Sequence, residues 1–130
     1  MESQTENAAS SSDNNTIGGA LGSGLRYFLS NKINCGGDFP LATLIINVVG
    51  AFFLAVIAFY AEKNKLDPRL ILFLKVGFCG GFTTFSTFAF EIFNLEKNGN
   101  LMLSIFYALI SIILSLIAIY FARFLILEKF

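Results

Sequence analysis

The chain lacks histidine and tryptophan, and it has little charge, proline and cysteine. Without histidine it has no residue of the type that most often serves as general base or metal ligand. Charged residues make up 14% of the 130 positions, whereas soluble domains average about 25%. The nine basic and nine acidic residues cancel, so the net charge gives no indication of a nucleic-acid partner. We find no catalytic constellation and do not predict an enzyme.

Cysteine is scarce throughout the chain, and hydrophobic residues are scarce at its N-terminus. Cys35 and Cys79 lack the spacing of a metal site. Because Cys79 falls inside an apolar segment and Cys35 in a loop, we do not expect a disulfide. Residues 1–15 are acidic, rich in serine and asparagine, and without the basic region that begins a signal peptide. We therefore predict a disordered polar tail over residues 1–15.

Apolar residues, in contrast, form 55% of the chain and give a mean hydropathy of +0.70. An apolar helix needs roughly 20 residues to cross the hydrocarbon core of a membrane. Four segments meet or approach that length: residues 17–29, 39–61, 70–95 and 98–122. The first is short, and its glycines suit close helix contacts. With Pro40 and Asp67-Pro68 as helix-start signals, we predict an all-α membrane protein with one four-helix transmembrane domain over residues 16–130.

The basic residues outside the apolar segments bear on orientation. An even number of spans places both chain ends on one side of the membrane. That side carries five basic residues and the other carries three: Lys63, Lys65, Arg69, Arg123 and Lys129, against Arg26, Lys32 and Lys97. The weak bias favours cytoplasmic termini and is equally compatible with insertion in both orientations.

Residues 77–88 lie inside the third apolar segment and read GFCGGFTTFSTF. Glycine and β-branched threonine both weaken a helix. Within a membrane, unwound backbone is tolerated only where it is buried in protein or lines a polar cavity. We therefore predict that the third helix is broken at mid-membrane and that the break marks an ion or substrate site.

Polar side chains recur on one face of the second and of the fourth apolar segment. Thr43 and Asn47 share a face, and Asn47 either makes an interhelical hydrogen bond or donates into a permeation path. Tyr107, Ser111 and Ser115 repeat every four residues, either as a polar track or as part of a helix seam. We assign to such a seam the small residues Ser104, Ala118 and Ala122.

Aromatic residues follow the glycine and threonine stretch directly. Phe85 and Phe88 lie three positions apart, interleaved with Ser86 and Thr87. They are either lipid-facing or core residues, or their positive ring edges face an anion in a pore. Two charges lie within the segments. Glu91 is either a pore-end carboxylate or an interfacial charge, and Arg26 is either paired, snorkelled to the interface or part of a vestibule.

Three stretches resemble motifs of one family, the small fluoride channels called Fluc or CrcB. Residues 18–27 read GGALGSGLRY and are similar to the family's opening motif GGxxGAxxRY, with Ser23 in place of alanine. Residues 43–50, TLIINVVG, resemble the second-helix motif, and residues 77–88 resemble the third-helix signature almost without departure. The resemblance covers residues 18–122, nearly the whole chain outside the predicted tail.

This resemblance implies an antiparallel, dual-topology homodimer in the cell inner membrane that conducts fluoride passively and so lowers cytoplasmic fluoride. It also implies two pores built from both subunits and a structural Na⁺ at the dimer centre, held by the backbone carbonyls of Gly80 and Thr83. The candidate pore residues are Thr43, Asn47, Phe85, Ser86, Thr87, Phe88, Tyr107, Ser111 and Ser115. Arg26 and Glu91 are candidates for a vestibule.

An alternative remains from the sequence, a four-helix, dual-topology, proton-coupled multidrug exporter of similar size. Such exporters resemble one another in having a carboxylate in the first helix, and residues 17–29 contain none. Glu91 is the one carboxylate well placed for proton coupling. A non-transporting scaffold is a further alternative, but it gives the broken third helix no purpose. We therefore predict a fluoride channel.

Overall fold

The structure, a computed structural model, describes residues 1–33 and 36–130, so Cys35 lies outside the described residues. Within them the chain is helical apart from turns and short connections, which confirms the predicted all-α fold. Two segments, η1 and η2, have the wider winding of a π-helix. The elements in chain order are α1 (Glu2–Ile33), α2 (Leu41–Lys63), α3 (Pro68–Ile71), η1 (Leu72–Cys79), α4 (Gly80–Phe82), α5 (Phe85–Lys97), α6 (Leu101–Arg123) and η2 (Phe124–Lys129).

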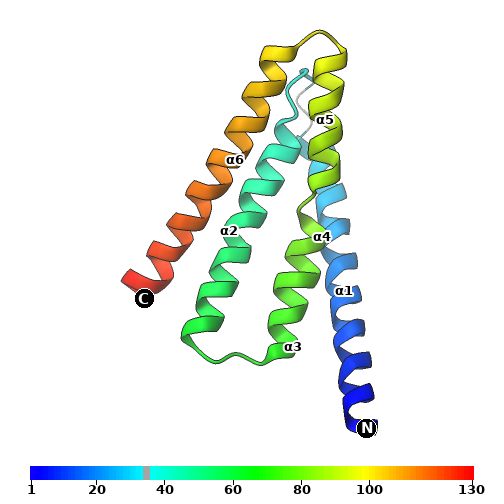
Figure 1. Ribbon diagram of the computed structural model, residues 1–130, viewed down its shortest axis with the longest axis vertical. Helices are drawn as coiled ribbons and strands as arrows, with labels where there is room; N and C mark the ends of the chain where they lie inside the picture. Colours follow the sequence, from blue (N-terminus) through cyan, green and yellow to red (C-terminus); the bar gives the residue numbers. More distant parts are fainter. Residues whose placement is uncertain (34–35) are drawn as a thin grey trace.

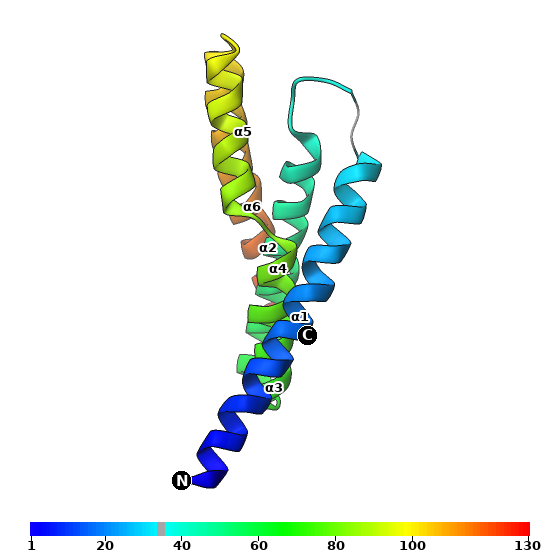
Figure 2. The same ribbon diagram turned by 90° about the vertical axis from the view of Figure 1, so that its right-hand side faces the viewer.

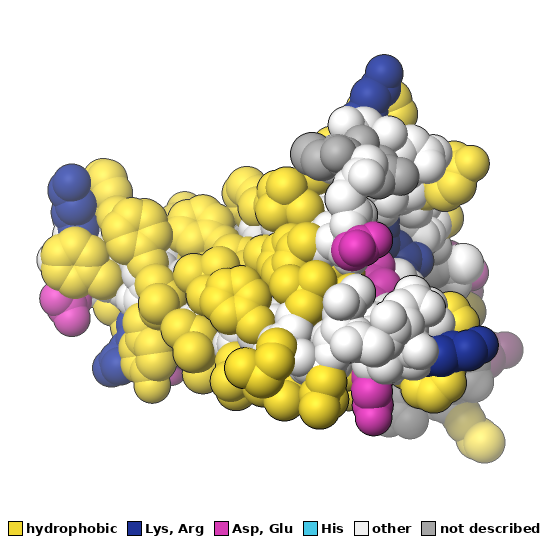
Figure 3. Space-filling model, turned by 90° about the horizontal axis from the view of Figure 1, so that it is seen from above, with side chains coloured by type: hydrophobic (Ala, Val, Ile, Leu, Met, Phe, Trp, Pro, Cys, Tyr) yellow, Lys and Arg dark blue, Asp and Glu magenta, His cyan; other side chains and the backbone are white. Residues whose placement is uncertain are grey.

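The hydropathy of these helices identifies a multi-pass membrane protein. Three stretches of the described chain are long and apolar enough to cross a membrane: Leu41–Lys63, Pro68–Lys97 and Leu101–Lys129. They match three of the four predicted segments. The fourth, residues 17–29, lies within α1 and is not among these three. Hydrophobic side chains cover much of the face seen in Figure 3, as expected for helices that contact lipid or a partner.

The helices pack side by side along the long axis of the molecule. In Figure 1, α2 lies between α6 and the α3–α4 part of the chain, and α1 lies on the far side of that part. A buried apolar cluster between α2, α5 and α6 contains Leu44, Leu95 and Tyr107. Figure 2 shows that α5 and the second half of α1 diverge above α4. This divergence separates two parts of the molecule that differ in packing.

The helix starts occur where the sequence predicts them. Pro40 directly precedes α2. The Asp67 side chain accepts a hydrogen bond of 2.9 Å from the backbone N–H of Arg69, and Pro68 occupies the first turn of α3. Between α5 and α6, Gly99 has φ +84°, a conformation that suits glycine. These signals therefore fix the turns that align the helices.

Residues 1–15 are predicted as a disordered tail, but residues 2–15 continue α1 in the structure. Extending a helix is far easier than starting one, and residues 17–33 supply the start. Contacts also reach into the extension. The Arg69 guanidinium donates a 2.6 Å hydrogen bond to Oδ1 of Asn7, and a Cβ on Gly77 would lie only 2.8 Å from the Asn15 carbonyl oxygen. The composition of residues 1–15, on which the predicted disorder rested, gives no sign of either contact.

Glycines bring the backbones of α1 and of the η1–α4 stretch into contact. A Cβ on Gly18 would lie 2.6 Å from the Phe73 carbonyl oxygen, and one on Gly81 would lie 2.5 Å from the Gly19 carbonyl oxygen. A Cβ on Gly22 would overlap the carbonyl of Phe78. These distances confirm the predicted close helix contact at Gly18, Gly19 and Gly22, whereas a Cβ on Gly24 would meet nothing within 4 Å.

Candidate functional site

The candidate site is built around two residues with extended backbone between α4 and α5. Thr83 has φ −78° and ψ 158°, and Thr84 has φ −148° and ψ 118°. The side chain of Asn47 in α2 binds both polar groups of the Thr84 backbone. Its Nδ2 donates to the Thr84 carbonyl at 3.0 Å, and its Oδ1 accepts from the Thr84 N–H at 2.8 Å. A tertiary contact thus replaces the helical hydrogen bond of the Thr84 N–H, whereas the Thr83 N–H still donates to the Cys79 carbonyl at 3.0 Å.

Helix α5 restarts immediately after this segment, with Thr84 as its N-terminal cap. The Thr84 hydroxyl oxygen accepts a 3.3 Å hydrogen bond from the Thr87 N–H and lies 3.1 Å from the Thr87 hydroxyl. The Ser86 hydroxyl lies 3.5 Å away. The positive end of the α5 dipole, together with its first N–H groups, therefore lies beside three hydroxyls.

Two phenylalanines occupy the first turn of α5. The ring centroids of Phe85 and Phe88 are 5.9 Å apart, with their planes inclined at 48°. Phe85 is 79% exposed in the single chain, whereas Phe88 packs against Tyr107 with centroids 5.3 Å apart. One ring of the pair is therefore part of the interior of the chain, and the other is open to a partner or to lipid.

The carboxylate of Glu91 joins three helices one turn further along α5. Oε1 accepts a 2.7 Å hydrogen bond from the Thr43 hydroxyl of α2, and Oε2 accepts one of 2.7 Å from the Tyr107 hydroxyl of α6. Tyr107 is fully buried, and Glu91 is partly buried. Glu91 is thus a shared acceptor for two candidate pore hydroxyls and not simply an interfacial charge.

The remaining hydroxyls of α6 divide between two uses. Ser111 is buried, and its hydroxyl donates to the Tyr107 carbonyl of its own helix at 2.7 Å. Ser115 is partly buried on the same face. The Ser104 hydroxyl donates to the Ile92 carbonyl of α5 at 3.2 Å, as its assignment to a helix seam predicts. Of the three hydroxyls in the predicted line, that of Tyr107 thus binds Glu91 and that of Ser111 binds its own helix, and a polar track along them stays a prediction.

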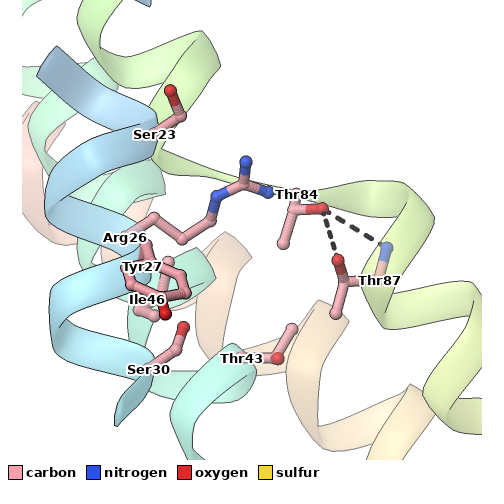
Figure 4. Close-up of a pocket in the computed structure, with 8 residues that line it drawn as sticks. All are labelled: Ser23, Arg26, Tyr27, Ser30, Thr43, Ile46, Thr84 and Thr87. Atoms are coloured by element: carbon pink, nitrogen blue, oxygen red, sulfur yellow. Dashed lines mark hydrogen bonds between the residues drawn. The ribbon is translucent and has the colours of Figure 1, made fainter. Parts of the chain in front are cut away.

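A polar cavity of about 270 Å³ opens beside the Thr83–Thr84 segment. Figure 4 shows the Arg26 side chain extending from α1 towards Thr84 across this cavity. A second cavity, of about 440 Å³, shares Thr43 and Thr87 with the first and reaches Glu91. A cationic group, several hydroxyls and a carboxylate thus line these two adjoining cavities between α1, α2 and α5, which together we call the polar cleft.

The backbone at the segment also offers ligands for a cation. In an uninterrupted helix the N–H of Thr84 would bind the Gly80 carbonyl, and that of Thr87 would bind the Thr83 carbonyl. Here those two donors bind Asn47 and the Thr84 hydroxyl instead. Gly80 is exposed, and a Cβ there would meet nothing within 4 Å. The carbonyls predicted to hold Na⁺ therefore fit that role, since their usual donors are engaged elsewhere.

Comparison with known proteins identifies the family. Residues 15–123 match the family model described as CrcB-like protein, Camphor Resistance (CrcB). The chain belongs to the CrcB-like family. The family match includes α2, α6 and every candidate site residue, so the polar cleft and the Thr83–Thr84 segment both lie within the CrcB-like region.

Several relatives carry a functional name. The fluoride-specific ion channel FluC 2 of Listeria innocua is 42% identical over 108 residues, which are 82% of this chain and 83% of that protein. The fluoride-specific ion channel FluC of Chlorobium phaeobacteroides is 42% identical over 110 residues, 83% of this chain and 85% of that protein. That of Idiomarina loihiensis is 36% identical over 108 residues, with 82% and 84% covered.

Two features of this CrcB-like site were not predicted. One is the partner of Asn47: an interhelical hydrogen bond was one of the two alternatives, but not the double bond to the Thr84 backbone. The other is the shared acceptor role of Glu91. A signal for the first exists in the sequence, because Gly50 lies three positions after Asn47 on the same face, and a Cβ there would overlap the Thr83 methyl group. A signal for the second is the position of Glu91 three residues after Phe88, on the face that meets Tyr107.

Proposed function

We propose that this chain is a fluoride-selective channel that conducts fluoride passively across the cell membrane and lowers cytoplasmic fluoride. The relatives named as fluoride-specific ion channels support this function. The observation that carries it is the gathering of anion-binding groups at the Thr83–Thr84 segment. The Asn47 amide, the start of α5 and the hydroxyl of Thr87 all lie there, and Arg26 lines the same cavity as Thr84 and Thr87.

The chemistry of these groups suits fluoride, which is small and strongly hydrated. An ion enters a pore only where fixed groups replace much of its water, and it leaves only if they bind it weakly enough. Nδ2 of Asn47 has two hydrogens and gives one to Thr84, so the second can reach an anion. The ring edges of Phe85 and Phe88, in the first turn of α5, carry positive electrostatic potential. Chloride is larger and gains less from such close donors.

The polar cleft provides an entry path in this proposal. Arg26 attracts anions to the cavity from solution, which raises their local concentration. Thr43 and Thr87 then offer hydroxyls along the path, and the buried Tyr107 of α6 is linked to it through Glu91. Glu91 holds the Thr43 and Tyr107 hydroxyls in fixed orientation, so it sets how readily these donors turn to a passing anion.

The active unit in this proposal is an antiparallel, dual-topology homodimer in which α1 is a fourth transmembrane helix and the Thr83–Thr84 segment breaks the third helix at mid-membrane. The exposure of Phe85 and Gly80 in the single chain supports a partner at this face. The carbonyls of Gly80 and Thr83 from both subunits would hold a structural Na⁺. When bound, that ion would supply positive charge that offsets the carbonyl dipoles at the helix crossing.

The proposal is tested by anion efflux from liposomes that contain the purified protein. Liposomes are loaded with fluoride or chloride, and efflux is followed with an ion-selective electrode after the membrane potential is released. We expect rapid fluoride efflux, and chloride efflux close to that of protein-free liposomes. Equal rates for the two anions, or no fluoride efflux, would contradict the proposal. The exporter alternative, which the named relatives do not favour, predicts no passive fluoride efflux.

A further inference from the structure

The Asn47 side chain contacts the backbone of Thr84 at two points. One amide group donates to the carbonyl at 3.0 Å and accepts from the N–H at 2.8 Å. This geometry is that of one rung of a β-ladder, with a side-chain amide in place of a second strand. The Thr84 N–H can only donate, which fixes Oδ1 of Asn47 towards it and Nδ2 towards the carbonyl.

The hydrogen bond from the Thr84 N–H to Asn47 competes directly with helix formation. If residue 84 became helical, its N–H would bind the Gly80 carbonyl, whereas the Thr84 carbonyl, at the N-cap of α5, can accept from α5 and from Asn47 together. Both backbone groups are already satisfied by Asn47, and the adjacent Thr87 N–H is satisfied by the Thr84 hydroxyl. Buried polar groups are costly to leave without partners, so the extended conformation depends on what Asn47 provides.

We propose that Asn47 is a positioning residue that holds Thr83 and Thr84 in the extended conformation, in addition to any contact that it makes with a permeating anion. This inference rests on the proposed function, because it explains how the pore region at the start of α5 is kept open. Since the Asn47 amide retains one hydrogen for an anion, the same side chain links the backbone of the segment to the ion path.

The neighbouring contact supports a role in positioning. Gly50 lies on the same face of α2 as Asn47, and a Cβ there would overlap the Thr83 methyl group. The absence of a side chain at position 50 lets α2 approach the extended residues closely enough for the amide to reach Thr84. Thr83 and Thr84 are thus each in contact with α2, through Gly50 and Asn47 respectively.

The test uses hydrogen–deuterium exchange of the full-length protein in fluoride-free buffer, where no contact with fluoride can contribute. Asn47→Ala removes both hydrogen bonds, whereas Asn47→Asp retains the acceptor for the Thr84 N–H and loses the donor. The matched control is Val49→Ala, which is on α2 and points away from this contact, with 38% of its surface exposed. Exchange is compared between peptides that cover residues 80–88 and peptides from α6.

We expect exchange of the residue 80–88 peptides to rise by about tenfold or more in Asn47→Ala and by less in Asn47→Asp, with α6 and Val49→Ala unchanged. Unchanged exchange at residues 80–88 in Asn47→Ala would overturn the inference. So would a uniform rise over all helices in both Asn47 variants, which indicates general destabilisation. Fluoride efflux of the wild-type protein is measured in parallel, because its absence would count against the proposed function and not against this role of Asn47.

Discussion

The two ends of the third helical stretch are packed in opposite ways. Below the Thr83–Thr84 segment, η1 and α4 meet α1 through glycines, and the backbones are in contact. Above it, α5 diverges from α1, and the space between them is the polar cleft lined by Arg26, Thr43, Thr87 and Glu91. The same pair of helical stretches is therefore closed on one side of the segment and open on the other.

The contrast shows how a small chain combines tight helix contacts with an open polar cleft. Glycine contacts exclude side chains and water from the closed end, as is typical of membrane helix packing. The extended residues then redirect the chain so that α5 leaves α1 and packs on α6. Polar groups that would be costly in hydrocarbon collect in the open end, where a polar cleft can hydrate them.

The largest effect is expected from filling the closed end. Gly22→Val adds a branched side chain where even a Cβ would overlap the Phe78 carbonyl. Overpacking costs about 1–3 kcal/mol in ordinary cores, and a backbone carbonyl cannot turn away as a side chain can. We expect loss of folded protein, measured as yield and elution on size-exclusion chromatography. Gly24→Val is the control, because a Cβ on Gly24 meets nothing within 4 Å; equal yields of the two variants would refute the close packing.

The next largest effect is expected at the opening of α5. Replacing Phe85 and Phe88 together by isoleucine removes the aromatic edges and keeps apolar bulk. We expect fluoride efflux to fall by about a hundredfold while the protein remains folded, since two edge contacts of about 1–1.5 kcal/mol each are lost. Efflux from proteoliposomes measures the effect. Wild-type rates in this double variant would exclude the rings from the pore.

The open end also shows what the sequence could and could not predict. Hydropathy and helix-start residues predicted α2, the α3–α5 stretch and α6, because the membrane imposes length and apolarity on each span. Thr83 and Thr84, the two residues with extended backbone, lie within the motif at residues 77–88; a break at mid-membrane stays a prediction. The partners of Asn47 and Glu91 were not predictable from the sequence, because they depend on which faces of α2 and α6 pack against the α3–α5 stretch. The helical residues 2–15 depend in the same way on tertiary contacts.

A moderate effect on stability is expected where Glu91 joins three helices. Glu91→Leu leaves the buried Tyr107 hydroxyl without its acceptor, at a cost of about 1–3 kcal/mol. Tyr107→Phe should cost less, because Glu91 keeps its hydrogen bond to Thr43. In the double variant the buried hydroxyl is absent, so we expect part of the loss to be recovered. Unfolding in SDS measures all three, and strictly additive losses would show that the two residues are not coupled.

The smallest effect is expected at the mouth of the polar cleft. Arg26→Gln removes the positive charge of the cavity and should lower fluoride efflux by about tenfold at low ionic strength, with a smaller loss in high salt. Lys32→Gln is the control, because Lys32 lies over the Phe28 ring, 5.7 Å from its centroid, and does not line the cavity. A loss that is independent of salt, or that is equal in both variants, would contradict attraction by Arg26.

The contrast between a closed and an open end is tested most directly by the reaction of cysteines with a water-soluble thiol reagent in proteoliposomes. Cys79, which is 1% exposed, reports on the closed end when Cys35 is replaced by serine. Thr87→Cys, combined with Cys35→Ser and Cys79→Ser, reports on the polar cleft. Because only an accessible thiolate reacts, we predict rapid labelling at position 87, slowed by fluoride, and almost none at Cys79. Equal labelling at the two positions, or no slowing by fluoride, would contradict the account.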